Sequence, residues 1–326
     1  MKLDVHNHVL PAASLDLLRS DPIYGATVTD TEFSGGNHSP FWLDPSFYNP
    51  DEKLAQLAAK GLDGAILSAA PPLFFYDLGA DPGERIARVT NLGLADFAAA
   101  HPDRLHWMAT VPMAAPERAI SVLRDAVDAG AIGVEVGTCV AGRRLDEHAY
   151  AAFWAAAEEL HTPVLLHPAF NEAHRGLDSY YFQNVIGNQL ETTVTIERLI
   201  ASGVLTRHPA LSIVLVHGWG YFPFQAGRFK HARTVRPELK DAPDDPWSFF
   251  GQVVVDTLTH DADTLRHLIA RVGRANVVMG TDSPFDMSTP EPMTMLREVA
   301  DDQTVRAIAE ENVARVYRLA MHTPVS

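Results

Sequence analysis

The chain has only one cysteine, Cys139, so it cannot form an intrachain disulfide. Its cysteine content therefore gives no indication of an oxidising compartment. No run of about 18 uninterrupted apolar residues is present, which argues against a membrane span. Residues 1–11 contain histidines and Asp4 where a signal peptide needs an apolar stretch. We expect a soluble, cytoplasmic protein.

Basic residues are also scarce, because 26 Lys and Arg stand against 41 Asp and Glu, a formal net charge of −15. No dense basic run offsets this charge, so nucleic acids and anionic membranes are not expected partners. A small anionic substrate remains compatible with it, since a few local arginines or a metal ion can reverse the field inside one cleft. We expect a small-molecule partner.

Two phosphate-binding motifs are missing: no Gly-x-Gly-x-x-Gly follows the first predicted strand, and no Walker-type loop is present. A nucleotide-binding open sheet therefore loses its usual support. Eight short β-branched runs alternate instead with Ala-rich helical segments, and this alternation predicts a single (β/α)₈ TIM barrel over residues 1–326. The predicted strands are Leu3–Val9, Gly64–Ala69, Leu105–Val111, Ile132–Gly137, Pro163–His167, Ser212–His217, Val253–Leu258 and Asn276–Thr281. The clearest predicted helices are Asp51–Lys60, Arg85–Ala100, Pro116–Ala129 and Asp146–Leu160.

Two stretches do not fit the repeat: Ser20–Pro50, rich in Pro, Gly, Asn and aromatic residues, and Phe170–Gln189 after the fifth predicted strand. Long insertions on the strand-to-helix side of a barrel commonly cover the substrate. The segment Gly25–Asp51 contains no Lys or Arg. Its aromatic residues indicate an apolar lid; they are Phe41, Trp42, Phe47 and Tyr48.

Metal-competent side chains lie on the first predicted strand and at the ends of three others. The two-residue period of a strand places His6 and His8 on one side of the first strand. His167, His217 and Asp282 each follow an apolar strand run. In a barrel these strand ends converge on one rim, where active sites are found. Four histidines and a carboxylate are a sensible ligand set for a divalent ion such as Zn²⁺.

A structural interpretation accounts for some of these residues one at a time. A His-x-His pair by itself is more often a hydrogen-bonded core feature, and Asp282 could cap the helix that follows it. Neither interpretation explains why the first, fifth, sixth and eighth strands all carry metal-competent side chains at the same end. The sequence therefore favours a metal site.

The chain resembles the amidohydrolase superfamily in this order of His-x-His, two further strand-end histidines and a final aspartate. More narrowly, it resembles the nonoxidative decarboxylase branch that contains aminocarboxymuconate semialdehyde decarboxylase. The resemblance covers nearly the whole chain. Its most specific motifs are His217-Gly218-Trp219-Gly220-Tyr221-Phe222-Pro223-Phe224, continuing to Gly227-Arg228, and Gly280-Thr281-Asp282-Ser283-Pro284-Phe285.

This resemblance, together with ligand chemistry, implies one divalent ion, Zn²⁺ with Mn²⁺ as an alternative. Superfamily members with two metals bridge them by a carboxylated lysine on the fourth strand, but Ile132–Gly137 has no lysine. The implied metal ligands are His6, His8, His167 and Asp282. The resemblance also implies that His217 is not a ligand but the general acid and base, beside Asp282 in the catalytic site.

The resemblance implies further contacts with the substrate. Arg228 is expected to enter the active site of a neighbouring subunit in a homodimer, although it could also be an exposed helix arginine. Trp219 and Phe285 could line a planar substrate or pack in the core, and His174 could contact the substrate or face solvent. The lid lacks the substrate-binding arginine of aminocarboxymuconate semialdehyde decarboxylase, and Trp219 replaces a small residue between two glycines. We therefore expect a different substrate.

The expected function is a metal-dependent nonoxidative decarboxylase acting on a small conjugated or aromatic carboxylic acid. One alternative is a hydrolase of an ester, amide, thioester or C–C bond, or a hydratase, because the same ligand set supports such chemistry. Another alternative is a noncatalytic protein that binds a metal for stability. That alternative predicts no open coordination position and no role for His217.

Overall fold

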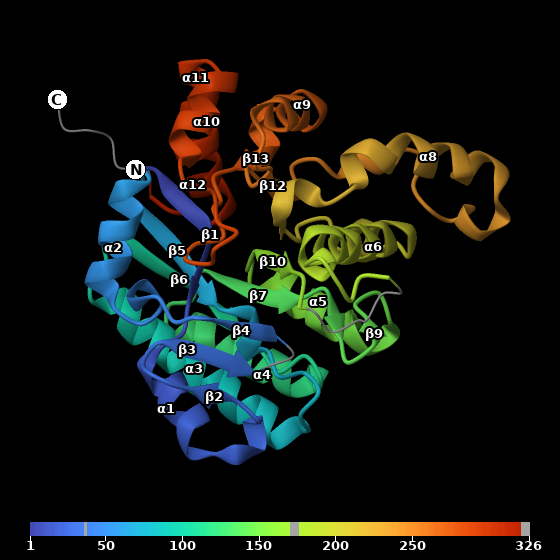
Figure 1. Ribbon diagram of the computed structural model, residues 1–326. Coiled ribbons are helices and arrows are strands. Elements are labelled where there is room, and N and C mark those ends of the chain that lie inside the picture. The colour runs from blue at the N-terminus through green and yellow to red at the C-terminus, as the bar shows by residue number, and fades with distance from the viewer. Residues whose placement is uncertain (36–37, 170–175, 321–326) are drawn as a thin grey trace.

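The computed structural model describes residues 1–35, 38–169 and 176–320. At its centre is an eight-stranded sheet in which each pair of neighbours is parallel. The strands follow one another in chain order (Figure 1). They are β1 (Leu3–Val9), β5 (Gly64–Ala69), β6 (Leu105–Thr110), β7 (Gly133–Gly137), β10 (Val164–His167), β11 (Ile213–Leu215), β12 (Val253–Asp256) and β13 (Val277–Val278).

The sheet closes on itself where the last strand meets the first. An isolated parallel bridge joins Asn7 to Ser283. Three backbone hydrogen bonds of 2.7 to 2.9 Å cross this seam: Val5 N to Met279 O, Asp282 N to His6 O, and His8 N to Ser283 O. The closed parallel sheet and its surrounding helices confirm the predicted (β/α)₈ barrel.

Helices surround the barrel in the alternating order that the sequence indicates (Figure 1). They are α1 (Ala12–Ser20), α2 (Pro50–Ala59), α3 (Ala80–Ala99), α4 (Pro116–Asp128), α5 (Ala151–Glu159), α6 (Asn188–Ala201), α7 (Val204–Arg207), α8 (Phe222–Val235), α9 (Ala262–Val272), α10 (Pro292–Val299), α11 (Asp302–Arg306) and α12 (Asn312–Val316). Local signals set several starts: Pro116 occupies the first turn of α4, and the Asp261 side chain accepts a hydrogen bond from Thr264 N at α9.

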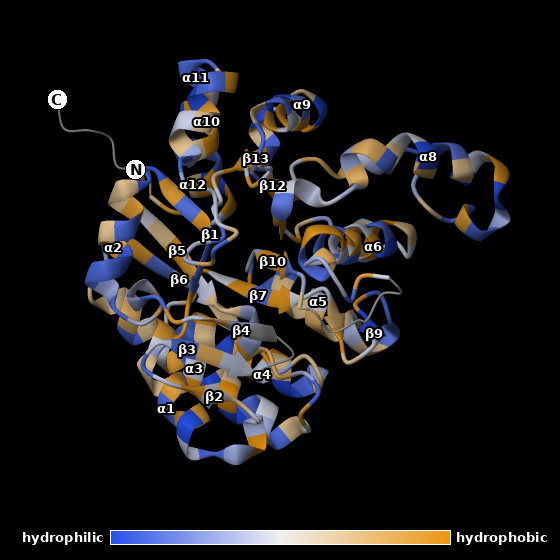
Figure 2. Ribbon diagram, viewed as in Figure 1, coloured by the Kyte–Doolittle hydropathy of each residue, from blue (hydrophilic) through white to orange (hydrophobic). Residues whose placement is uncertain are grey.

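Two layers of apolar side chains explain why the strands read as nearly continuous hydrophobic runs. Residues such as Ile66, Leu165 and Val254 fill the barrel interior, while their neighbours along each strand pack against the helices. Figure 2 shows the hydrophobic residues gathered on the strands. Within the described part of the chain, no helix combines the length and the apolar character that a bilayer crossing requires.

β1 and β5 have the predicted bounds, and β7 and β10 end where predicted but begin one residue later. β6, β11, β12 and β13 end earlier than predicted: Ser212–His217 forms only β11, and Asn276–Thr281 forms only β13. His217 (φ 56°) and Asp282 (φ 64°), which follow β11 and β13, adopt the left-handed conformation, which a strand does not use.

The insertion Ser20–Pro50 has more regular structure than the sequence indicates. It contains a small antiparallel sheet of β2 (Thr27–Val28), β3 (Glu32–Gly35) and β4 (His38–Trp42), beside the barrel in Figure 1. In the second insertion, Phe170–Gln189, residues 170–175 lie outside the described residues. The part from residue 176 onward contains a π-helix, Gln183–Gly187, that leads directly into α6.

Candidate metal centre

Four side chains from both ends of the chain and its middle meet at one point in the structure. His6 and His8 come from β1, His167 ends β10, and Asp282 follows β13. One ligand atom from each residue lies within 4.8 Å of those of the other three, and all four residues are buried. The barrel therefore brings together the residues that the sequence predicts as metal ligands.

The three imidazole rings surround a common point at nearly equal spacing. The centroid of the His6 ring is 5.1 Å from that of His8 and 5.1 Å from that of His167. His8 and His167 are 5.0 Å apart, and each pair meets edge to face. This arrangement differs from stacked packing, in which rings lie face against face, and it allows one nitrogen of each ring to approach the centre.

In each of the three rings, one nitrogen is hydrogen-bonded to an oxygen that can accept a hydrogen bond but cannot donate one. The Nδ1 donors and their acceptors are His6 to Asp256 Oδ2 (2.7 Å), His8 to Ala69 O (3.3 Å) and His167 to Pro168 O (2.7 Å). Since a carbonyl or ionised carboxylate oxygen has no proton to give, Nδ1 carries a hydrogen in each ring. In the neutral form of each ring the lone pair is therefore on Nε2, which is the tautomer that metal binding requires.

The atoms left over by these bonds define the site. His6 Nε2, His8 Nε2, His167 Nε2 and Asp282 Oδ1 are all buried without a hydrogen-bond partner in the described part of the chain. Asp282 Oδ1 lies 3.1 Å from His8 Nε2 and 3.3 Å from His6 Nε2. Buried polar atoms are normally paired, so four unpaired atoms around one point need an explanation. Three neutral nitrogens and one carboxylate oxygen fit a divalent cation such as Zn²⁺.

Burial and mutual proximity shift the pKa values of these ligands. Burial lowers the pKa of His8 to about 4, and burial together with neighbouring His8 and His6 holds the pKa of His167 well below its usual value. Burial also lowers the pKa of His6, but Asp282 and Asp256 outweigh it and raise the pKa to about 10. Metal binding requires neutral imidazoles, so protonation competes with the metal at His6 more than at His8 and His167.

His217 lies beside this cluster and is not one of its four members. It follows β11 in a tight turn, and its Nε2 is 3.6 Å from Asp282 Oδ2. Its ring centroid is 5.1 Å from that of His6 and 5.3 Å from that of His167. The His217 side chain therefore faces the cluster. It approaches Oδ2 of Asp282, whereas the unpaired ligand atom of Asp282 is Oδ1.

Phe285 occupies the position expected of a wall beside the metal site. Its ring centroid is 5.4 Å from His8, and it also packs against Phe41 of the lid at 5.2 Å and Phe47 at 5.1 Å. Phe41 and Phe47 of the insertion thus connect through Phe285 to His8, one of the four candidate metal ligands. Among the predicted substrate contacts that lie within the described residues, Phe285 is the one that the structure brings to the site.

Trp219 instead packs in a separate aromatic cluster. It is 1% exposed, stacks on Phe222 at 4.6 Å, and meets Trp247 and Phe250 edge to face. Arg228 is exposed on α8, which extends away from the barrel (Figure 1). His174 lies outside the described residues.

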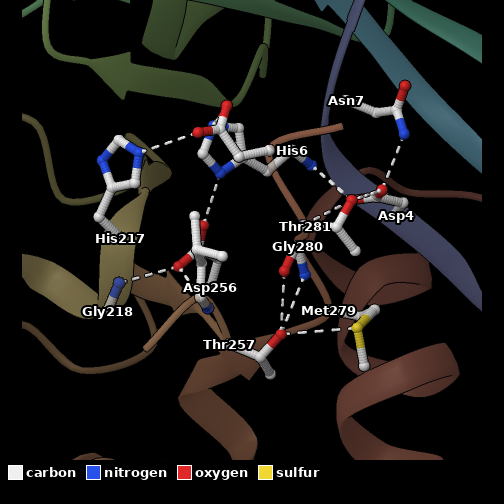
Figure 3. A network of polar contacts seen from close by, with 12 residues as sticks. Asp4, His6, Asn7, His217, Gly218, Asp256, Thr257, Met279, Gly280 and Thr281 are labelled. Atoms are coloured by element: carbon white, nitrogen blue, oxygen red, sulfur yellow. Dashed lines mark hydrogen bonds and ion pairs between the residues drawn. The ribbon is translucent and has the colours of Figure 1, made fainter. Parts of the chain in front are cut away.

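Sequence reasoning missed two buried residues that support the ligands. Asp256 follows the apolar run Val253–Val255 at the end of its strand, as His167 does on β10. A polar residue at the end of an apolar strand is therefore the signal that could have identified Asp256. Figure 3 shows it between His6 and Gly218. Lys53 of α2 is fully buried, and its Nζ donates to Asn7 Oδ1 (2.7 Å) and His8 O (2.9 Å). Nothing in its local sequence distinguishes it from an exposed helix lysine.

Burial lowers the pKa of Lys53 to about 7, and the nearby carboxylates of Asp4 and Asp44 oppose this shift. Asp4 is also buried, and it accepts hydrogen bonds from Thr281 N (3.0 Å) and Asn7 Nδ2 (2.8 Å). Asp4 and Lys53 together hold β1 at the seam where the ligands of the first and last strands meet.

The comparison with known families agrees with this site. A family model described as Amidohydrolase matches residues 3–319. The chain belongs to the amidohydrolase family. The resemblance predicted from the strand-end histidines and aspartate is thereby confirmed.

Three proteins to which this chain is similar are named as decarboxylases. The 2-amino-3-carboxymuconate-6-semialdehyde decarboxylase of Dictyostelium discoideum is 27% identical over 92% of this chain and 86% of its own length. The gamma-resorcylate decarboxylase of a Rhizobium species is 28% identical over 82% and 87%. The solved structure of the 5-carboxyvanillate decarboxylase of Novosphingobium aromaticivorans shares the fold, with a TM-score of 0.80 and 20% identity. The match covers 98% of this chain and 96% of that one, and that structure contains manganese and 4-hydroxy-3-methoxy-5-nitrobenzoic acid.

We predict about one divalent ion per chain, because one cluster of matching ligands exists among the described residues. Replacing any of His6, His8, His167 or Asp282 by Ala should lower the metal content measured by mass spectrometry, and the same measurement should separate zinc from manganese. The exposed His161, outside the cluster, provides a matched His161→Ala control that should keep its metal. Stoichiometric metal in all four ligand variants would refute the site.

Proposed function

We propose that this amidohydrolase is a metal-dependent nonoxidative decarboxylase that acts on a small conjugated or aromatic carboxylic acid. The observation that carries the proposal is the set of four unpaired ligand atoms with His217 beside them and an aromatic wall next to them. The decarboxylase names of the similar proteins support the same reaction.

His6, His8, His167 and Asp282 would hold the divalent ion, which supplies Lewis-acid chemistry when bound. These four protein ligands leave room for an oxygen of the substrate if the ion takes five or six partners. Zinc is the ion we propose from the ligand set, and manganese is the alternative, since a structural neighbour contains it.

The proposed chemistry replaces a carboxylate with a proton. A proton is first added to the carbon that bears the carboxylate, and this interrupts the conjugation of the ring or chain. The bond from that carbon to the carboxylate then breaks, CO₂ leaves, and the electron pair of the broken bond restores the conjugation. His217 Nε2, which faces the cluster at 3.6 Å from Asp282, is the group that we place to deliver this proton.

The aromatic wall favours a planar substrate. Phe285 contacts both His8 and the lid residue Phe41, so a ring entering the site would meet aromatic faces or edges. The segment Gly25–Asp51 offers no Lys or Arg to bind a second carboxylate. We therefore propose a substrate with one carboxylate that binds near the metal ligands and an otherwise apolar or phenolic ring.

The reaction itself is tested with the metal-loaded protein and a panel of carboxylated phenols, muconate semialdehydes and simple esters. We expect CO₂ release from one of the planar acids, with deuterium at the former carboxylate carbon when the reaction runs in D₂O. Ester or amide cleavage without CO₂ would show a hydrolase instead. Water addition to a double bond would show a hydratase, and no turnover with any planar acid would count against the proposal.

Replacing His217 by Asn should remove the proton donor while keeping the metal ligands. General acid–base catalysis typically contributes about 10²–10⁴-fold to a rate, so kcat should fall on that scale. Metal content and thermal melting, measured on the same preparation, should stay near the values of the unmodified protein. Loss of metal would make His217 a ligand. Near-normal turnover in a folded, metal-loaded variant would remove His217 from the mechanism.

We further propose that the protein is a homodimer in which Arg228 contacts the active site of the partner. Its support is the Gly227-Arg228 match to the decarboxylase branch and the exposure of Arg228 on the projecting helix α8. Mixing and reassembling inactive Arg228→Ala with inactive Asp282→Ala should partly restore activity, because one site of each hybrid dimer is intact. A fully active monomer in solution would contradict this arrangement.

A further inference from the structure

We infer that Asp256 is a positioning residue that holds two functional side chains with one carboxylate: the metal ligand His6 and the proposed acid/base His217. The part that concerns His6 depends on the metal site alone. The part that concerns His217 rests on the proposed function. The two parts are therefore tested by different measurements.

Asp256 lies at the end of β12 and is fully buried. Its Oδ2 accepts a hydrogen bond from His6 Nδ1 at 2.7 Å. Its Oδ1 accepts from Gly218 N at 2.9 Å and from Leu258 N at 3.1 Å. Figure 3 shows the carboxylate between the His6 ring and the Gly218 backbone. Both oxygens are thus used, and they join three strands of the barrel rim.

The bond to His6 differs in kind from the bonds to the other two metal-binding rings. His8 Nδ1 contacts the backbone carbonyl of Ala69 and the hydroxyl of Ser68, and His167 Nδ1 donates to the carbonyl of Pro168; none of these partners carries a net charge. His6 donates to a carboxylate, and charge-assisted hydrogen bonds are shorter and stronger. A carboxylate on Nδ1 also raises the basicity of the opposite nitrogen, Nε2. Asp256 therefore sets both the orientation of His6 and its strength as a ligand.

The bond to Gly218 acts on the turn that carries His217. Gly218 N is the first amide after His217, and both residues are left-handed, at φ 56° for His217 and φ 62° for Gly218. A left-handed histidine is held there only if its surroundings define the turn. Asp256 Oδ1 supplies such a contact from a neighbouring strand. The carboxylate therefore fixes the backbone from which the His217 ring reaches Asp282.

Two other buried carboxylates near the site lack this arrangement. Asp4 accepts hydrogen bonds from backbone and side-chain groups of β1 and of Thr281, but none from an imidazole ring. Glu135 Oε1 is 3.7 Å from His8 Nδ1, beyond hydrogen-bonding distance. Among the described residues, Asp256 is the carboxylate whose hydrogen bond orients a metal-binding ring.

An amide of the same size cannot replace this carboxylate. Asparagine has one accepting oxygen, and its amide nitrogen is a donor. If the oxygen of Asp256→Asn faces His6, the amide hydrogens face Gly218 N and Leu258 N, which are also donors. If the side chain is reversed, the amide hydrogens face the His6 Nδ1 proton. Either orientation breaks one of the two connections.

The first test measures metal affinity in Asp256→Asn, Asp256→Ala and a matched control, Thr257→Val. Thr257 is the next residue along the chain and is equally buried, and its hydroxyl bonds the backbone of Gly280 without touching His6 or His217. Losing the carboxylate partner of a metal-binding histidine typically weakens metal affinity about 10–100-fold. We expect that loss in both Asp256 variants, measured by chelator competition for Zn²⁺, and less than about threefold in Thr257→Val.

Urea unfolding of the same variants separates positioning from stability. We expect Thr257→Val to lose stability while keeping its zinc affinity, because it breaks buried hydrogen bonds elsewhere on the rim. The absorption spectrum of the Co²⁺-loaded protein should change in Asp256→Asn and stay unchanged in Thr257→Val. Equal weakening of zinc binding in the control and in Asp256→Asn would overturn the inference for His6, as would unchanged affinity in both Asp256 variants.

The second test is a double-mutant cycle of Asp256→Asn with His217→Asn, measured as kcat at saturating metal. If Asp256 acts on turnover through His217, Asp256→Asn should lower kcat in the unmodified background and have little further effect when His217 is already absent. Its effect on zinc affinity should persist in both backgrounds. Independent, multiplicative losses of kcat would overturn the part of the inference that concerns His217.

A spectroscopic measurement covers the case in which the Asp256 variants do not fold. In the unmodified, zinc-loaded protein with ¹⁵N-labelled histidine, the His6 Nδ1 proton should give a strongly downfield resonance that is lost in His6→Gln. Absence of that resonance would overturn the bond to Asp256. Zinc affinity and this resonance do not depend on the substrate, so a failure to detect CO₂ release would leave them informative.

Discussion

The closure of the barrel between β1 and β13 is the constraint on which the site depends. Three backbone hydrogen bonds across this seam bring His6 and His8 beside Asp282, from opposite ends of the chain. The buried side chains of Asp4 and Lys53 add bonds along the same seam. A metal ion bound there would connect the first and last strands, so its binding energy would also stabilise the closed barrel.

The unpaired atoms of the site explain why so much of its surroundings is polar and buried. Each imidazole must present Nε2 to the centre, and this requires an acceptor at Nδ1 on the outer side. For His8 and His167 a backbone carbonyl at a strand end is an acceptor, with the Ser68 hydroxyl also beside His8, whereas His6 has the carboxylate of Asp256. The ligand set and its support therefore come from different strands and form one connected network.

The proposed function assigns reaction chemistry and substrate choice to different parts of the molecule. The ligands and His217 stand at strand ends, which the barrel holds rigidly. The aromatic wall of Phe285, Phe41 and Phe47 is shared between a barrel loop and the insertion after β1. Insertions vary more easily than strands, so a family with one ligand set can act on many acids. The overall charge of −15 gives no guide to this local environment.

The sequence by itself was sufficient for the eight strands, the four candidate ligand residues and the insertion after β1, because these depend on local patterns: apolar runs, the two-residue period and polar residues at strand ends. The tertiary structure decided what depends on distant contacts. It placed His217 and Asp282 in left-handed turns after β11 and β13, paired Asp256 with His6, and buried Lys53 against Asn7. It also packed Trp219 among Phe222, Trp247 and Phe250. Such partners lie far apart in the chain, so no local pattern specifies them.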